Sequence, residues 1–266
     1  MNFYYWKVRM KLTKNIELTD DGLALFLEDI RSLVIADLHI GLELALMDEG
    51  TFLPIDQYSD IKRKILDWVD LYTPEQIIIN GDFKHEFGRA SKQEWTEILD
   101  LWDTLAKKNV RLEVVRGNHD NYLITVLKKR DKEIKDPSYS IDRYFFSHGH
   151  KEVDIPLDSE VVILAHEHPA IVLRDEIGGR HKFKCLLYGT WQDKTVIVLP
   201  ALSPLSGGSV INGRTQDKLF SPFLRKIELD TFKPIVMDKS KLLEFPTLGE
   251  MDQIDYQEDW DNNLFF

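Results

Sequence analysis

The sequence predicts an α/β fold, because short apolar runs alternate with amphipathic helical segments through the first half of the chain. In the second half the apolar runs follow one another with few helical segments between them, which predicts mostly β-structure there. The chain has 266 residues, of which 43% are hydrophobic and 30% charged, as is typical of a globular protein. The length lies between what is typical of one domain and of two, and a single α/β unit of roughly 200–250 residues followed by a tail also fits it.

Buried strands and amphipathic helices are predicted in turn along the first half. The apolar runs at 33–36, 77–79 and 110–115 are too short for helices and are predicted to be strands. Apolar residues at helical spacing predict a helix over 56–72, and a second apolar stripe predicts a helix that begins at Ser91 as its N-cap. The tryptophans of both stripes are expected to pack in the core.

The second half is predicted to begin with a charged helix and to continue as strands. The basic stretch 128–135 is predicted to be helical, either as a solvated helix end or as a surface that follows a nucleic-acid backbone. The apolar runs at 144–146 and 161–164 are predicted to be strands, and those at 185–188 and 196–199 are predicted to form a hairpin.

Charge and cysteine content exclude several classes of protein. The net charge of −11 argues against a protein that coats DNA through a basic face. The single cysteine, Cys185, excludes an intrachain disulfide framework and a thiolate metal cluster, and it favours a reducing, cytoplasmic location. The first residues lack an apolar run of signal-peptide length, and no apolar run of about 18 residues predicts a membrane span.

A change in composition near residue 240 divides the predicted domains. Residues 1–239 are predicted to form the α/β domain, and 240–266 an acidic tail with seven acidic residues and one lysine. The tail also carries large apolar residues, namely Ile254, Tyr256, Trp260, Leu264, Phe265 and Phe266. Because solvating acidic tails are poor in aromatic residues, we expect either a docking segment for a partner protein or a segment that folds back onto the domain.

Metal-binding residue types follow successive apolar strands at the point where each strand ends. They are Asp37, His39, Asp82, Asn118, His119, His148, His166 and His168. Ligands of open α/β sheets gather at the carboxyl ends of strands, and a set of oxygen and imidazole donors without thiolate suits Mn²⁺, Fe, Zn²⁺ or Ni²⁺. Since these ligands are too many for one ion, we predict a dinuclear hydrolytic site. His150 is expected at the surface or beside the ligands, and His181 is left unassigned.

The spacing of these residues resembles a known motif series. Asp37-x-His39, Gly81-Asp82-x-x-His85, Gly117-Asn118-His119-Asp120, His148 and His166-x-His168 resemble, in order, the motifs of the calcineurin-like metallophosphoesterases. The resemblance covers residues 30 to 205. More closely, 36–43, 81–88 and 200–208 are similar to the SbcD-related, ICC-like branch of that family. Ser203 stands where that branch usually has Asn, so no role is assigned to Ser203.

The resemblance implies a fold and a set of metal ligands. The implied fold is a four-layer αββα sandwich with two mixed β-sheets. Asp37, His39 and His168 would hold one divalent ion, and Asp82 would bridge it to a second ion. Asn118, His148 and His166 would hold that second ion. The favoured ion is Mn²⁺, with Fe, Zn²⁺, Ni²⁺ or Mg²⁺ as alternatives. The implied reaction is attack of a metal-bridged hydroxide on phosphorus, with His119 as the general acid.

Residues beside the ligands favour one substrate class. His85 stands where related protein phosphatases have Asp, and several nucleases of the SbcD class have His there. An imidazole can shuttle a proton or contact a phosphodiester, so we predict a nuclease, most specifically a DNA exonuclease in repair acting on single strands or ends. Lys84 and Arg116 are candidate contacts for substrate phosphate, although Arg116 could equally be a solvated strand end.

Other functions of the same family remain alternatives at this point. A phosphoesterase of this kind could cleave small phosphodiesters, cyclic nucleotides or phosphoproteins. A non-enzymatic scaffold is disfavoured, because this chain keeps His119 and the full ligand set. For a repair nuclease, the expected partner of the tail is a helicase, a clamp or a single-strand-binding protein.

Overall fold

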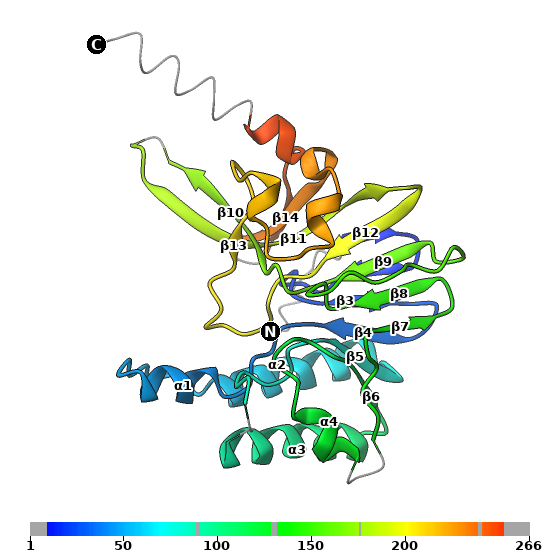
Figure 1. Cartoon of the computed structure of the whole chain (residues 1–266), viewed down its shortest axis with the longest axis vertical. Helices are drawn as coiled ribbons and strands as arrows, with labels where there is room; N and C mark the ends of the chain where they lie inside the picture. Colours follow the sequence, from blue (N-terminus) through cyan, green and yellow to red (C-terminus); the bar gives the residue numbers. More distant parts are fainter. Residues whose placement is uncertain (1–9, 89–90, 129–131, 176, 239–240, 253–266) are drawn as a thin grey trace, which may run out of the picture.

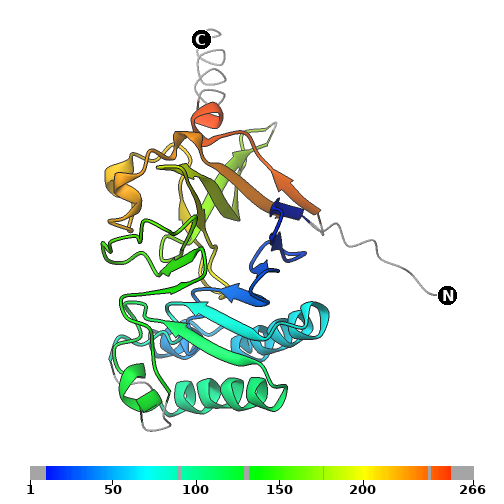
Figure 2. The ribbon, with the colours of Figure 1, turned by 90° about the vertical axis from the view of Figure 1, so that its right-hand side faces the viewer.

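Two β-sheets lie face to face, and α-helices cover the outer face of the first sheet (Figure 1). The computed structural model describes residues 10–88, 91–128, 132–175, 177–238 and 241–252. Seen from the side, the helices, the first sheet and the second sheet follow one another as layers (Figure 2). The predicted α/β sandwich with two mixed sheets is confirmed.

The first sheet has six strands in the order β1-β2-β3-β4-β5-β6. Their bounds are β1 Met10–Thr13, β2 Ile16–Leu18, β3 Leu25–Leu27, β4 Ser32–Ile35, β5 Gln76–Asn80 and β6 Arg111–Val115. The first four strands are antiparallel neighbours, whereas β4, β5 and β6 run parallel to one another. The three predicted strands are therefore the parallel part of the sheet, and their carboxyl ends lie at one edge.

The second sheet has nine strands and is also mixed. Its strands are β7 Ser138–Ile141, β8 Tyr144–Ser147, β9 Val161–Leu164, β10 Pro169–Arg174, β11 Arg180–Trp191, β12 Lys194–Val198, β13 Ser209–Val210, β14 Lys233–Asp238 and β15 Lys241–Glu244. Strands β8, β9 and β12 are parallel, while β11 and β12 form the predicted antiparallel hairpin. The carboxyl ends of the three parallel strands therefore lie at one edge of this sheet as well.

Helices lie mostly on the first sheet. The α-helices are α1 Leu42–Asp48, α2 Gln57–Tyr72, α3 Lys92–Lys107 and α4 Leu123–Lys128. The side chain of Asp56 accepts a hydrogen bond from the Ser59 backbone N–H and begins α2. The predicted N-cap Ser91 forms a capping box with Glu94 and begins α3. Over the second sheet lie short 3₁₀ helices, η1 Gln216–Lys218, η2 Leu224–Lys226 and η3 Leu229–Thr231, together with a helical turn at residues 248–252.

Three apolar clusters hold the layers together. Trp68 and Trp102 of α2 and α3 pack with Ile77 and Ile79 on the helical side of the first sheet, which confirms their predicted core role. Ile78, between those two isoleucines, points the opposite way and packs with the second sheet. This alternation follows from the two-residue period of a strand, so a strand buried on both faces reads as a continuous apolar run. A third cluster joins the second sheet to the 3₁₀ helices.

The basic stretch 128–135 differs from its prediction. Helix α4 ends at Lys128, and the described residues 132–135 are not helical. Lys135 instead forms a parallel bridge to Val115 of β6. The charge pattern cannot distinguish a helix end from an extended segment that joins a sheet edge, and here the pairing with β6 decides the conformation.

The first part of the predicted tail packs onto the domain. Strand β15 pairs with β14, and Leu248 and Met251 are buried in the cluster beside the 3₁₀ helices. The boundary at 240 stays a prediction. The docking residues Ile254, Tyr256, Trp260, Leu264, Phe265 and Phe266 lie outside the described residues. Within the described part of the chain, no helix is long and apolar enough to cross a membrane.

Candidate metal centre

The predicted ligands converge where parallel strands of both sheets end. Asp37, Asp82 and Asn118 follow β4, β5 and β6 of the first sheet, and two further turns follow β8 and β9 of the second. The side chain of Asn80 joins the two sheets here, because its Nδ2 donates to the carbonyls of Ser147 and Ile163, each at 3.0 Å. Residues far apart in sequence are thereby held at one place.

Two groups of metal-binding side chains form at this junction. One contains Asp37, His39 and His168, and the other contains Asp82, His148 and His166, with the ligand atoms of each group within 4.8 Å of one another. His168 Nε2 lies 3.1 Å from Asp37 Oδ1, and His148 Nε2 lies 3.2 Å from Asp82 Oδ2. The structure thus brings Asp37, His39 and His168 together in one group and His148 and His166 in another, while their binding of metal ions stays a prediction.

Two residues connect these groups in the predicted way. Asp82 Oδ2 is 3.8 Å from His39 Nε2 as well as close to His148, so its carboxylate reaches both groups. Asn118 Oδ1 is 3.2 Å from His148 Nε2, which adds a neutral oxygen to the second group. A bridging carboxylate between two sets of imidazole and oxygen donors is an arrangement that suits two divalent ions.

The backbone of the ligand turns is strained. Positive φ values, between 45° and 70°, occur at Asp37, His39, Asp82, His166 and His168. Residues other than glycine rarely adopt this region, because each such conformation costs roughly 1–3 kcal/mol and persists only where surrounding contacts offset that cost. Here contacts between neighbouring turns hold this backbone conformation, since the backbone N–H of Asp37 donates to the carbonyl of Gly81 and that of His39 donates to the carbonyl of Asp82. The strain directs several ligands into one small volume.

Two glycines permit the close approach of ligands. A Cβ at Gly81 would lie 2.2 Å from His148 Nδ1, and a Cβ at Gly117 would lie 2.1 Å from Asp82 Oδ1. Any side chain at either position would displace a ligand. The Gly81-Asp82 and Gly117-Asn118 pairs of the motifs therefore have a steric cause.

Hydrogen bonds from outside the ligand set orient two of the imidazoles. His148 Nδ1 lies 3.0 Å from the carbonyl of Asn80, and His168 Nδ1 lies 2.8 Å from Ser206 Oγ. In both rings this leaves Nε2 directed at a carboxylate of the centre. Such partners fix the tautomer and orientation of metal-binding histidines. Sequence analysis missed Asn80 and Ser206, although Ser206 lies in the 200–208 segment that carries part of the family resemblance.

Burial and charge act in opposite directions on the ionisable groups. Burial lowers the pKa of His39 to about 3 and, with nearby His148, that of His166 to about 4. Both rings are thus held in the neutral form that a metal ion requires. Burial alone would lower the pKa of His148, but Asp82 and Asp37 outweigh it and raise that pKa to about 9. His148 therefore has to release a proton when it binds a metal ion.

The carboxylates of the centre are held ionised. Burial alone would raise the pKa of Asp37, but His168 and His148 together lower it below its usual range. Burial likewise opposes ionisation of Asp82, and His148 outweighs it, so the pKa of Asp82 is strongly lowered. Asp37 Oδ1 is fully buried, and it faces the imidazole nitrogens His168 Nε2 at 3.1 Å and His148 Nδ1 at 3.7 Å. A buried anionic oxygen of this kind is costly unless a cation meets it, so the residues fit bound divalent ions.

His119 and His85 lie at the rim of this centre. The backbone N–H of His119 donates to Asp82 Oδ1 at 3.0 Å, and its side-chain Nε2 lies 3.9 Å from Asp82 Oδ2. His119 Nδ1 contacts the carbonyl of His85, while His85 Nδ1 lies 3.4 Å from His39 Nδ1. His39, His85 and His119 form a third group with ring nitrogens within 4.8 Å. Both predicted catalytic histidines are therefore beside the ligands.

Lys84 and Arg116 are predicted to contact substrate phosphate, but both side chains form hydrogen bonds with other residues of the protein. Lys84 is fully buried, and its Nζ donates to the carbonyls of Glu86 and Gly88. Arg116 Nη1 lies 2.6 Å from Asp136 Oδ2, and its Nη2 donates to Asn121 Oδ1 at 2.6 Å. These placements favour supporting roles for both side chains over direct contact with substrate.

Further residues, to which the sequence analysis assigns no role, support the ligand turns. The buried carboxylate of Asp120 accepts hydrogen bonds from the backbone N–H groups of Gly117 and Phe83, which joins two of the turns. Gln57 Nε2 donates to the carbonyl of His39 and to Ser203 Oγ, so Ser203 belongs to a buried network. A lone Asp, Gln or Ser gives no periodic signal, and only the folded structure shows these contacts.

The remaining histidines differ in position. The ring of His150 lies 5.3 Å from that of His148 and 6.1 Å from that of His166, so it neighbours the ligands without joining a ligand group among the described residues. His181 Nε2 lies 2.8 Å from Asp175 Oδ2, and both residues are exposed.

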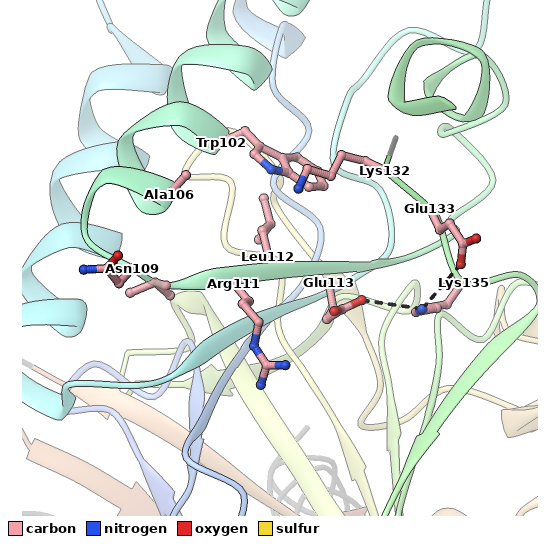
Figure 3. Close-up of a pocket in the computed structure, with 10 residues that line it drawn as sticks. Trp102, Ala106, Asn109, Arg111, Leu112, Glu113, Lys132, Glu133 and Lys135 are labelled. Carbon is pink, nitrogen blue, oxygen red and sulfur yellow. Dashed lines mark ion pairs between the residues drawn. The ribbon is translucent and has the colours of Figure 1, made fainter. Parts of the chain in front are cut away.

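A pocket of about 520 Å³ lies away from the metal centre (Figure 3). It is lined by the first residues of β6, by Trp102 and by Lys132, whereas the ligands follow the opposite end of β6. Lys135 Nζ pairs there with Glu113 Oε2 at 3.7 Å and with Glu133 Oε2 at 3.9 Å. Three of the charged side chains of this pocket thus pair with one another. None of the residues that line the pocket belongs to the metal centre.

Sequence comparison identifies the family. The family model for calcineurin-like phosphoesterases matches residues 30–232, which include every residue of the centre. The chain belongs to the calcineurin-like phosphoesterases. As a member of this metallophosphoesterase family it is a metal-dependent hydrolase, and the family uses two divalent ions. A search of curated proteins gave no match.

Solved structures of other proteins are similar to this chain. The nuclease MPE of Pseudomonas putida is 22% identical, with a TM-score of 0.61, over 86% of this chain and 95% of that chain. YfcE, a phosphoesterase from E. coli, is 14% identical, with a TM-score of 0.40, over 81% of this chain and 98% of that chain. At 22% identity, the likeness to the nuclease MPE concerns the fold alone.

Proposed function

We propose that this phosphoesterase is a phosphodiesterase that hydrolyses DNA, acting as an exonuclease in DNA repair. The observation that carries the proposal is the position of His85, whose imidazole packs beside the imidazoles of both His39 and His119. A carboxylate at that position would hold His119 as a cation. A neutral imidazole leaves the rim less acidic, which favours entry of a phosphodiester anion. The likeness to a solved nuclease, MPE of Pseudomonas putida, agrees with this substrate class.

The ligand groups specify what the protein contributes to a metal-dependent reaction. Asp37, His39 and His168 would hold one ion, Asn118, His148 and His166 the other, and Asp82 both. When bound, two divalent ions supply Lewis-acid stabilisation of the phosphoryl group and lower the pKa of water. Oxygen and imidazole donors suit Mn²⁺, which we propose as the native ion.

His119 is placed to deliver the proton that the leaving oxygen needs. Its Nδ1 is engaged by the carbonyl of His85, so its Nε2 is the atom free to act toward the centre. Expulsion of a sugar oxygen is unfavourable without protonation, because the alkoxide is a strong base. General acid catalysis of this kind contributes typically about 10²–10⁴-fold.

A direct assay tests the proposed substrate class. The full chain, stripped of metal and reloaded with Mn²⁺ or Mg²⁺, is given end-labelled single-stranded and double-stranded DNA, bis-p-nitrophenyl phosphate, p-nitrophenyl phosphate and a phosphopeptide. We expect stepwise shortening of DNA from its ends and hydrolysis of the diester, both abolished by EDTA. Faster turnover of the phosphopeptide or the monoester than of DNA would contradict the proposal.

We also propose a repair protein, such as a helicase, a clamp or a single-strand-binding protein, as the partner of the acidic tail, and a cytoplasmic location. The tail proposal rests on the large apolar residues from Ile254 to Phe266 in an acidic sequence. Aromatic anchors surrounded by charge are typical of docking segments.

A further inference from the structure

We propose that Phe87 binds the nucleobase of the leaving nucleotide by stacking, and so selects nucleic acid over other phosphodiesters. This inference rests on the proposed function and deepens it. Phe87 lies two residues after His85 in the second motif turn, at the rim of the metal centre.

The ring of Phe87 lies against the proposed general acid. The ring centroids of Phe87 and His119 are 3.7 Å apart, with an angle of 31° between the ring planes. Nevertheless 57% of Phe87 is exposed, so most of this large apolar side chain is open to solvent. A single exposed apolar residue is ordinary on a protein surface. A ring that contacts a catalytic imidazole on one side and is open on the other is a preformed stacking surface.

The turn that carries Phe87 is held rigidly. Lys84 Nζ donates to the carbonyls of Glu86 and Gly88, the residues on either side of Phe87. The backbone N–H of Glu86 donates to Glu94 Oε1 at 2.9 Å, which joins the turn to α3. The contact between the carbonyl of His85 and Nδ1 of His119 also holds this turn in place. These contacts give a reason for the burial of Lys84 beside the centre: its side chain positions Phe87 and does not contact the substrate.

The position of Phe87 selects one side of the scissile bond. His119 protonates the leaving oxygen, so the group next to His119 is the leaving nucleoside. Stacking of a base on an aromatic ring contributes about 1–3 kcal/mol per base and tolerates any base, because every base has a π-face. Phe87 therefore favours a phosphodiester whose leaving group carries a nucleobase, with little dependence on sequence.

The test compares two dinucleotides that differ in one base. Both are deoxydinucleotides with the same retained nucleoside, and in the second the leaving nucleoside is abasic. The Mn²⁺-loaded wild type, Phe87→Ala, Phe87→Trp and the control Phe52→Ala are assayed for kcat/KM on both. Phe52→Ala removes a phenylalanine that is more exposed, at 73%, and lies beyond α1.

We expect wild type and Phe52→Ala to prefer the complete dinucleotide by about 5- to 150-fold, the fold-change that corresponds to one stacked base. Phe87→Ala should lose most of this preference by slowing on the complete substrate alone, and Phe87→Trp should keep it. If Phe87→Ala slows both substrates equally, or if wild type shows no preference, the inference is wrong.

Failure of the proposed function gives a different result. In that case wild type hydrolyses p-nitrophenyl phosphate or a phosphopeptide but neither dinucleotide, and the inference falls with the function. Equal melting temperatures of all four proteins show that the comparison concerns binding and not folding.

Discussion

Asp82 Oδ1 accepts a hydrogen bond from the backbone N–H of His119 at 3.0 Å. The other oxygen of the same carboxylate faces His148 at 3.2 Å and His39 at 3.8 Å. One buried side chain therefore reaches both ligand groups and fixes the turn that carries the general acid. Asp82 therefore contacts both the proposed metal ligands and the backbone of the proposed general acid, and the two proposed roles can be tested separately.

The first prediction removes the charge of the bridge. Asp82→Asn keeps the size of the side chain and can still accept the hydrogen bond from His119, but it no longer offers an anion between two dications. We expect loss of at least one bound Mn²⁺ per chain, measured by elemental analysis after dialysis, and activity at the metal-free background. Full metal content with normal turnover would rule out a bridging role.

The second prediction concerns proton delivery. His119→Ala should retain bound metal, because the hydrogen bond to Asp82 comes from the backbone of residue 119. Hydrolysis of DNA should slow by about 10²–10⁴-fold, whereas bis-p-nitrophenyl phosphate, with its good leaving group, should slow much less. Equal losses on the two substrates would mean that His119 orients ligands or substrate and does not act as the acid.

The third prediction tests the steric role of a motif glycine. Gly117→Ala places a methyl group 2.1 Å from Asp82 Oδ1, so it should displace the bridge and lower metal content. Gly88→Ala is the matched control, because a Cβ there meets nothing within 4 Å. We expect Gly88→Ala to bind metal like wild type. Equal metal content in the two variants would show that the Gly117 contact is unimportant.

The fourth prediction uses the half-buried amine of Lys184, whose Nζ donates to the carbonyls of Ala201 and Ser203. Burial lowers the pKa of Lys184 from 10.5 to about 8 in the folded protein. Between these values the unfolded chain binds more protons, so the contribution of Lys184 to stability rises with pH. Relative to Lys184→Gln, wild type should gain about 2 kcal/mol in unfolding free energy from pH 7 to 10. A difference that is constant with pH in denaturant titrations would contradict this.

A fifth prediction concerns the acidic tail. Truncation after Asp252 keeps Leu248 and Met251, which are buried against the domain. We expect an unchanged melting temperature and nuclease rate, together with loss of binding to a purified repair helicase, clamp or single-strand-binding protein. A large fall in melting temperature would favour the alternative, in which the tail packs onto the domain.

The sequence predicts those parts of the fold that a local pattern determines. The parallel strands read as apolar runs because both faces are buried, and Ser91 and Asp56 mark helix starts because capping needs those side chains. The ligands are predictable because each follows a strand end. The conformation of 132–135 is not, since its charges suit a helix end as well as a segment paired to β6.

Supporting contacts of the centre could not be predicted in the same way. Asn80 and Ser206 orient His148 and His168 from positions 68 and 38 residues away in the chain. Lys84 looks like a substrate contact in sequence, because a lysine beside a metal motif is usually exposed. Its burial follows from the curvature of the 86–88 turn, which supplies the carbonyls that its ammonium group needs.

The two ligand groups predict that one chain holds two divalent ions. This is best measured by a crystal structure of the Mn²⁺-loaded protein, with anomalous data collected near the manganese edge. We expect two anomalous peaks roughly 3.5–4 Å apart, bridged by Asp82, one beside His39 and His168 and the other beside His148 and His166. A single peak, or peaks bound by other residues, would show that the proposed dinuclear site is wrong.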